Sequence, residues 1–233
     1  MDGKQLQLQP RLRMLADLVP AGAGLADVGT DHGYLPVRLL QEGRISRAIA
    51  SDINPAPLEH ARRTAAKYGV GDRMDFRLCA GLDAVGAEEA DAIVIAGMGG
   101  ETIISILQAA PWTRRPGLTL LLQPMTKAEN LRIWLADNGY TFIGERLASD
   151  KGHLYPILLA TGGEREKLTP AEACGGVLLE GDPLWGQYLD RQMRRARRRI
   201  EGLEHAGRTD AAAEIERLED LYRALEERKE RIV

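Results

Sequence analysis

The segment Asp27-Val28-Gly29-Thr30-Asp31-His32-Gly33 has the residue types of a cofactor-binding turn. It follows a short apolar run and precedes a segment with helical periodicity. A glycine-rich turn at the carboxyl end of a first strand is where α/β proteins bind nucleotide-type cofactors. A dinucleotide-binding fingerprint would have glycine at position 31, so that the backbone can approach a pyrophosphate. The carboxylate of Asp31 would instead repel a phosphate and offset the attraction of the helix N-terminus.

This acidic turn favours a cationic ligand. S-adenosylmethionine has no phosphate and carries a sulfonium and an ammonium beside its carboxylate, so Asp31 would attract it while discouraging NAD. The alternative is that Asp31 only caps the helix that follows. The sequence therefore predicts S-adenosylmethionine as the cofactor, with the first group of contacts made by Asp27, Gly29, Thr30, Asp31 and Gly33.

Three later turns supply the remaining predicted cofactor contacts. Asp52 ends a second apolar run, where a carboxylate can accept both ribose hydroxyls, and Ile53 follows it. Gly81 and Leu82 follow a third run and could line the adenine pocket, although a simple turn is almost as good an explanation. The fourth run leads into a glycine cluster that allows close backbone approach, from which we select Ala96, Gly97, Met98 and Gly99.

The candidates for contact with the methyl acceptor lie beside the same turns. We predict Asp31, His32 and Tyr34 as catalytic residues, because the two rings could stack on a base and the carboxylate could stabilise developing positive charge. A packing role is an equal alternative for His32. Gln123 opens Gln123-Pro124-Met125 and is predicted to bind substrate, with a strand-ending proline turn as the alternative.

Short apolar runs alternate with helical patterns up to about residue 160, which indicates a parallel α/β sheet with helices on both faces. A closing pair of strands would give the mixed edge usual in Rossmann-like class I methyltransferases. The expected helices are Leu6–Leu18, Tyr34–Glu42, Pro57–Tyr68, Glu101–Ala109 and Ala128–Asn138. The expected strands are Gly24–Val28, Arg47–Ser51, Met74–Leu78, Ala92–Ala96, Leu118–Leu122, Phe142–Leu147 and Leu154–Ala160.

The pattern changes after Thr161-Gly162-Gly163, so we divide the chain into a cofactor-binding domain, 1–163, and a second domain, 164–233. Two narrow apolar stripes there predict an antiparallel coiled-coil hairpin, with Thr209 or Asp210 as the cap of its second helix. Its first helix contains the run RQMRRARRR, and we predict substrate contacts for Arg191, Arg194, Arg195 and Arg198. The alternatives are pairing with the acidic second helix, or a hairpin that serves dimerisation.

The composition excludes several classes of protein. Hydrophobic and charged residues make up 44% and 28% of the 233 residues, as in ordinary soluble proteins. No stretch approaches the roughly 20 apolar residues that span a bilayer. Cys79 and Cys174 form no CxxC pair, and the histidines lack metal-ligand spacing. We therefore expect a cytoplasmic protein without a metal or a membrane contact, and we favour a monomer.

Three blocks resemble a known family. Asp27-Val-Gly-Thr-Asp-His-Gly-Tyr-Leu-Pro36, Ala96-Gly-Met-Gly-Gly-Glu101, and Leu122-Gln-Pro124 with Leu131-Arg-Ile-Trp-Leu135 are similar to the bacterial tRNA (adenine-N1)-methyltransferases that act on adenine 22, the TrmK family. The resemblance covers about residues 6–160 and extends to a helical hairpin. It implies S-adenosylmethionine as cofactor and tRNA as partner. Tyr155 departs from the pattern, since Pro156 follows it instead of an acidic residue.

Three other functions compete with this one. An NAD-dependent oxidoreductase is disfavoured by Asp31. A methyltransferase for another RNA or for a small molecule could share the fold, although a small-molecule enzyme would have little use for an arginine-rich hairpin. A non-catalytic RNA-binding module would bind tRNA without transferring a methyl group.

Overall fold

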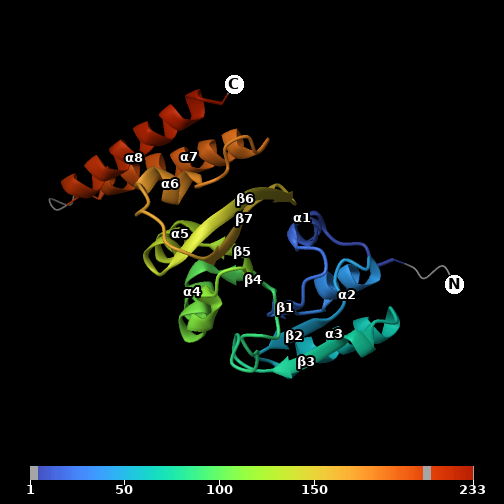
Figure 1. The fold of residues 1–233 in the computed structure, drawn as a ribbon. Coiled ribbons are helices and arrows are strands. Elements are labelled where there is room, and N and C mark those ends of the chain that lie inside the picture. Colours follow the sequence, from blue (N-terminus) through green and yellow to red (C-terminus); the bar gives the residue numbers. More distant parts are fainter. Residues whose placement is uncertain (1–4, 207–210, 233) are drawn as a thin grey trace.

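The computed structural model describes residues 5–206 and 211–232 (Figure 1). One seven-stranded sheet has the order β3-β2-β1-β4-β5-β7-β6, with the first five strands parallel and β7 antiparallel to both of its neighbours. This arrangement confirms the predicted Rossmann-like methyltransferase sheet with a mixed edge. The strands are β1 (Leu25–Val28), β2 (Ala48–Asp52), β3 (Met74–Leu78), β4 (Ala92–Gly99), β5 (Thr119–Thr126), β6 (Tyr140–Asp150) and β7 (His153–Gly162).

Helices cover both faces of the sheet, which explains why the central strands are apolar runs rather than alternating patterns. Leu25 and Val94 pack towards one group of helices, whereas Ala26 and Ile95 pack towards the other. The first group is α1 (Pro10–Leu18), α2 (Tyr34–Gln41) and α3 (Pro55–Lys67), and the second is α4 (Gly100–Ala109) and α5 (Ala128–Asp137). Short 3-10 turns occur at Gly71–Arg73 and Pro111–Arg114.

Several element boundaries differ from the sequence prediction. Helix α1 begins at Pro10 rather than Leu6, because a residue before proline is disfavoured in the helical region and Gln9 is extended with ψ 154°. Helix α3 begins at Pro55, two residues before the predicted start. Strands β4 and β5 continue to Gly99 and Thr126, beyond their predicted ends at Ala96 and Leu122.

The β6–β7 hairpin is longer than predicted. Its two-residue turn is Lys151-Gly152, and both residues have positive φ, 49° and 78°. Pro156 lies opposite Leu147 of β6, beyond the part of β7 that pairs with β5. At this position β7 is paired with β6 alone, so no strand on its other side requires a hydrogen bond from the N–H that proline lacks. Strand β7 therefore stays continuous through Tyr155 and Pro156.

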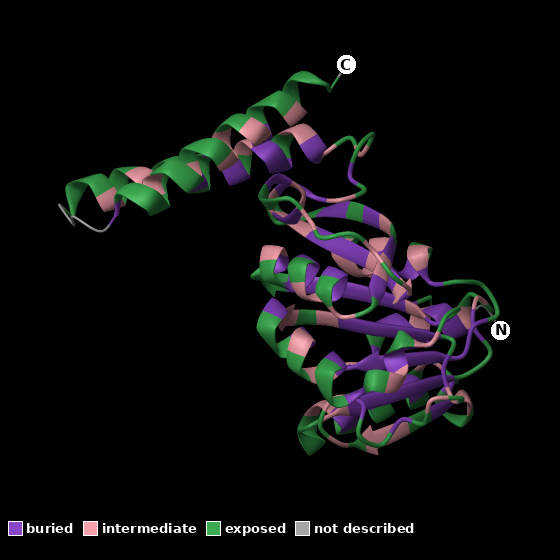
Figure 2. Cartoon of the chain, turned by 60° about the vertical axis from the view of Figure 1, so that its left-hand side comes forward, coloured by how far each residue is buried: buried purple, intermediate pink, exposed green. Residues whose placement is uncertain are grey.

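The C-terminal part is the predicted helical hairpin, formed by α7 (Trp185–His205) and α8 (Ala212–Glu230). A short helix that the sequence did not predict, α6 (Pro170–Gly175), precedes it and begins with a capping box between Thr169 and Glu172. Most of the hairpin's own buried residues lie at its end near the sheet (Figure 2). The predicted caps Thr209 and Asp210 fall outside the described residues. Within the described ranges, no helix has both the length and the apolarity that crossing a membrane requires.

A buried ion pair ties the two parts together. Arg132 of α5 and Glu145 of β6 are fully buried, and the guanidinium donates to the carboxylate at 2.8 Å. Arg132 also donates to the Ala173 carbonyl of α6, while Glu145 accepts the backbone N–H groups of Val177 and Leu178. The segment that leads into the hairpin is therefore anchored to the edge of the sheet through hydrogen bonds to charged groups.

Candidate active site

The turn after β1 is held by backbone hydrogen bonds to the next strand. The N–H groups of Gly29 and Thr30 both donate to the Ser51 carbonyl, at 2.8 and 3.1 Å. Gly29 has a φ of 72°, and an added Cβ would lie 2.2 Å from the Cε of Met98. Glycine meets both requirements, because it accepts positive φ and has no side chain to collide with the β4 segment.

The two acidic residues of this turn have opposite environments. Asp27 is buried and accepts the Thr30 hydroxyl at 2.6 Å, whereas Asp31 is exposed. Burial raises the pKa of Asp27 from 3.8 to about 6; the negative charge of Asp52 adds to this shift, and the Thr30 hydrogen bond opposes it. Asp31 itself lies at a positive φ of 49°.

Three aromatic rings stack beside the turn that follows β1. The His32 ring lies between those of Tyr34 and His60, with centroids 5.1 and 4.9 Å away and nearly parallel planes. Tyr34, the first residue of α2, is 40% exposed. The predicted pair therefore belongs to a column of three rings, and His60 of α3 is a member that sequence spacing did not indicate.

A cavity of about 260 Å³ lies at the ends of β1 and β4. It brings together most of the residues predicted from the first turn and two from the β4 segment. Its lining is Arg11, Leu12, Asp27, Gly29, Thr30, Asp31, His32, Tyr34, Leu35, Ala96 and Gly97. The lining combines two carboxylates, two aromatic rings and one guanidinium, so it offers both signs of charge to a ligand.

Arg11, Leu12 and Leu35 are cavity residues that the sequence analysis missed, and Arg11 is the charged one. It comes from α1, and its guanidinium donates to the side-chain oxygen of Gln123. The same oxygen accepts the Gly97 N–H at 3.2 Å, while the Gln123 amide nitrogen donates to the Pro124 carbonyl at 3.1 Å. Gln123 is fully buried, and its polar atoms are engaged in these hydrogen bonds. Its side chain does not line the cavity.

The other predicted cofactor residues lie outside the lining of this cavity but along the same edge of the sheet. Asp52 accepts the Asn54 N–H at 2.8 Å, and Ile53 beside it is 68% exposed. The Ser51 hydroxyl donates to the Gly81 carbonyl at 3.2 Å, so the end of β2 contacts the turn after β3. Two of the predicted glycines lie at helix starts: Gly33 is the N-cap of α2 and Gly99 that of α4. Leu82 is buried, and the Met98 side chain lies against Gly29.

A larger groove of about 610 Å³ lies between the sheet and α7. It contains Arg191 and Arg195 of the predicted substrate-binding set. The groove is lined by Pro124, Met125, Thr126, Lys127, Ala128, Glu129, His153, Leu154, Tyr155, Pro156, Tyr188, Arg191, Gln192 and Arg195. Because the Arg11 guanidinium lies 5.8 Å from the centroid of the Tyr155 ring, the groove and the cavity are neighbours.

The arginines of α7 separate into different faces. Arg197 lies over the Tyr222 ring and Arg199 pairs with Glu214 at 2.7 Å, so these two face α8. Arg194 and Arg198 are exposed and contact each other through a hydrogen bond to the Arg194 carbonyl. The arginine that pairs with the acidic second helix is therefore Arg199, which is not one of the four predicted to contact substrate.

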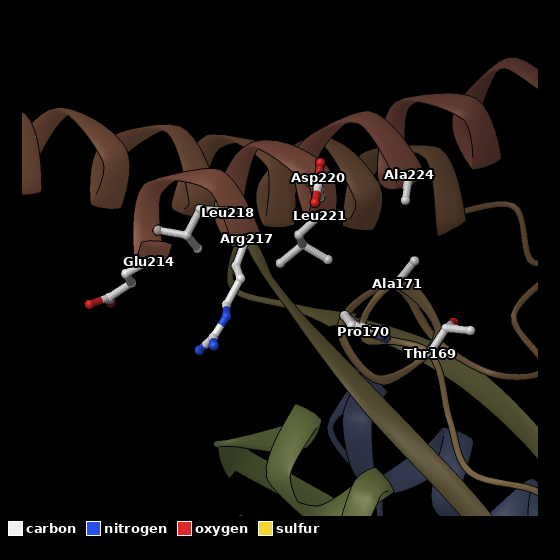
Figure 3. Close-up of a pocket in the computed structure, with 9 residues that line it drawn as sticks. All are labelled: Thr169, Pro170, Ala171, Glu214, Arg217, Leu218, Asp220, Leu221 and Ala224. Atoms are coloured by element: carbon white, nitrogen blue, oxygen red, sulfur yellow. The ribbon is translucent and has the colours of Figure 1, made fainter. Parts of the chain in front are cut away.

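A further hollow of about 500 Å³ lies between α6 and α8, away from all the predicted site residues (Figure 3). It is lined largely by apolar side chains such as Leu218, Leu221 and Ala224, while the Arg217 guanidinium points outward. Among the described residues, no group of three or more His, Cys, Asp or Glu side chains could hold a metal ion.

Comparison with known proteins connects both parts of the chain to one group. The methyltransferase-domain family matches residues 8–158. The tRNA (adenine(22)-N(1))-methyltransferase of Bacillus subtilis (strain 168) is 36% identical over 188 residues, which cover 81% of this chain and 77% of that protein.

Solved structures extend the likeness to nearly the whole chain. The B. subtilis m1A22 tRNA methyltransferase TrmK has a TM-score of 0.86 at 31% identity, covering 96% of this chain and 99% of that one. Streptococcus pneumoniae Sp1610 in complex with S-adenosyl-L-methionine has a TM-score of 0.80 at 31% identity, covering 96% of this chain and all of that one.

Proposed function

Because this chain belongs to the tRNA (adenine(22)-N1)-methyltransferase family, we propose that it transfers a methyl group from S-adenosylmethionine to N1 of adenine 22 in tRNA. The observation that carries the proposal is the likeness of both parts, sheet and hairpin together, to relatives of this one activity. Family membership decides against the oxidoreductase that the sequence left as a rival.

The cavity at β1 and β4 has the groups that this cofactor needs. Bound there, S-adenosylmethionine would supply an electrophilic methyl group. Asp27 and Asp31 offer two carboxylates to its cationic groups, and the Gly29 turn allows close approach of the backbone. Asp52, at the end of the neighbouring strand, would accept the ribose hydroxyls.

The protein's main chemical task is alignment. N1 of neutral adenine already has a lone pair, so no base is needed to create the nucleophile, and holding the reacting atoms in line while excluding water is the principal contribution. The methylated base is cationic, and the exposed carboxylate of Asp31 at the cavity would stabilise that charge. Tyr34, at the end of the three-ring column, would position the base by stacking, and His32 would support the Tyr34 ring from behind.

The target base has to leave its stack, which costs a few kcal/mol. We propose that 164–233 forms a tRNA-binding domain beside the cofactor domain, 1–163, and that contacts to phosphates offset this cost. Arg191 and Arg195 are placed for this because they line the groove next to the cavity, and Arg194 and Arg198 extend the basic surface along α7.

The test is incubation with labelled S-adenosylmethionine and unmodified tRNA, followed by mapping of the methylated nucleotide. We expect one methyl group on N1 of adenine 22. Asp31→Ala should lose activity but keep the fold, whereas Asp137→Ala, which removes an exposed carboxylate at the end of α5, should retain activity. Methylation at another position, or full activity of Asp31→Ala, would contradict the respective assignment.

A further inference from the structure

Arg11 is held in the cavity by groups from three other segments. Its guanidinium donates to the Gln123 side chain of β5, lies close to Gly97 of β4, and lies over the Tyr155 ring of β7. Gln123 is itself fixed by hydrogen bonds to Gly97 and Pro124. A long, flexible side chain that is supported in this way presents its remaining N–H donors in a defined place.

The cavity lining carries charges of both signs. Arg11 supplies a positive charge, while Asp27 and Asp31 supply negative charge on the side of the β1 turn. Among the described residues, Arg11 forms no ion pair with a carboxylate, whereas Arg13, on the same helix, pairs with both Asp17 and Glu42. The cavity thus offers a guanidinium and two carboxylates, which are not paired with each other, to the same small ligand.

An α-amino acid group has the complementary pattern, since its ammonium and its carboxylate are attached to the same carbon. We propose that Arg11 binds the carboxylate of the methionine part of S-adenosylmethionine, opposite the aspartates that face its ammonium. The proposal rests on the proposed function for the identity of the ligand. A guanidinium binds a carboxylate through two parallel, charge-assisted hydrogen bonds, and these are stronger in a partly enclosed site than in water.

The wild-type protein provides the first test. Titration calorimetry compares S-adenosylmethionine with its decarboxylated form, which keeps the sulfonium and the amine but lacks the carboxylate. We expect decarboxylated S-adenosylmethionine to bind about ten- to one-hundred-fold more weakly. Equal affinity for the two ligands would overturn the role of Arg11, whereas no binding of either ligand would overturn the cofactor assignment itself.

A variant then assigns the difference to one side chain. Arg11→Met should weaken the binding of S-adenosylmethionine by about the same factor but leave that of the decarboxylated ligand within about twofold. Arg13→Met is the matched control, because this arginine of α1 does not line the cavity, and it should keep the wild-type preference. Equal weakening of both ligands by Arg11→Met, or weakening of tRNA binding alone, would refute the proposal.

Discussion

Removing Arg191 and Arg195 together tests how the hairpin meets RNA. These two arginines line the groove between α7 and the sheet. Both side chains are exposed: Arg191 donates to the Leu154 carbonyl at 3.1 Å, and Arg195 donates to the Gln192 side-chain oxygen at 3.2 Å and lies 3.8 Å from Glu129. The variant Arg191→Gln/Arg195→Gln therefore removes two available phosphate contacts while keeping side chains of similar size.

Counterion release gives the magnitude. Each phosphate contact contributes about 0.7 to 0.9 to the slope of log affinity against log salt concentration. Loss of two contacts should reduce the slope by about 1.4 to 1.8. Across a fourfold increase in salt, the advantage of the wild-type protein over the variant should then shrink about seven- to twelvefold.

The assay is tRNA binding, measured by fluorescence anisotropy at several salt concentrations. The matched control is Arg197→Gln/Arg199→Gln, which removes the same charge from the same helix but on the face towards α8. We expect the control to keep the wild-type slope. If both double variants lower the slope equally, the effect is one of net charge, and the groove is not the contact surface.

Three further outcomes follow from the site and the core. Affinity for S-adenosylmethionine should fall as the pH is lowered through about 6, because the pKa of Asp27 is raised to that value and protonation removes its charge. Calorimetry of Asp27→Asn should show no such titration. If the variant keeps the pH profile of the wild-type protein, Asp27 is not the titrating group. Gly29→Ala should cost about 1–2 kcal/mol in urea unfolding through its positive φ. Adding Met98→Ala should not restore this stability, and full recovery would instead make the steric contact responsible. Arg132→Leu should cost about 3–5 kcal/mol because it leaves Glu145 buried without its charge partner. Adding Glu145→Gln should recover part of that loss in the same assay, and a double variant no more stable than the single one would contradict this reasoning.

The sequence by itself determined the sheet and the position of the glycine turn after its first strand. Both depend on short-range patterns: apolar runs of strand length, helical periodicity, and glycines at the ends of strands. The Gly29 turn and the β6–β7 hairpin were predictable because each conformation is set by a few neighbouring residues. Boundaries were less accurate, as at Pro10, where one proline outweighed the periodicity before it.

Only the tertiary structure decided which distant residues meet. Arg11 reaches Gln123 across 112 positions, and Arg132 meets both Glu145 and the helix before the hairpin. No local pattern marks such pairs, since a guanidinium on a helix has the same sequence signature whether it faces water, a cavity or a buried carboxylate. The same reason separates Arg191 from Arg199: they belong to one charged run, but the packing of α7 against α8 and the sheet gives them different partners.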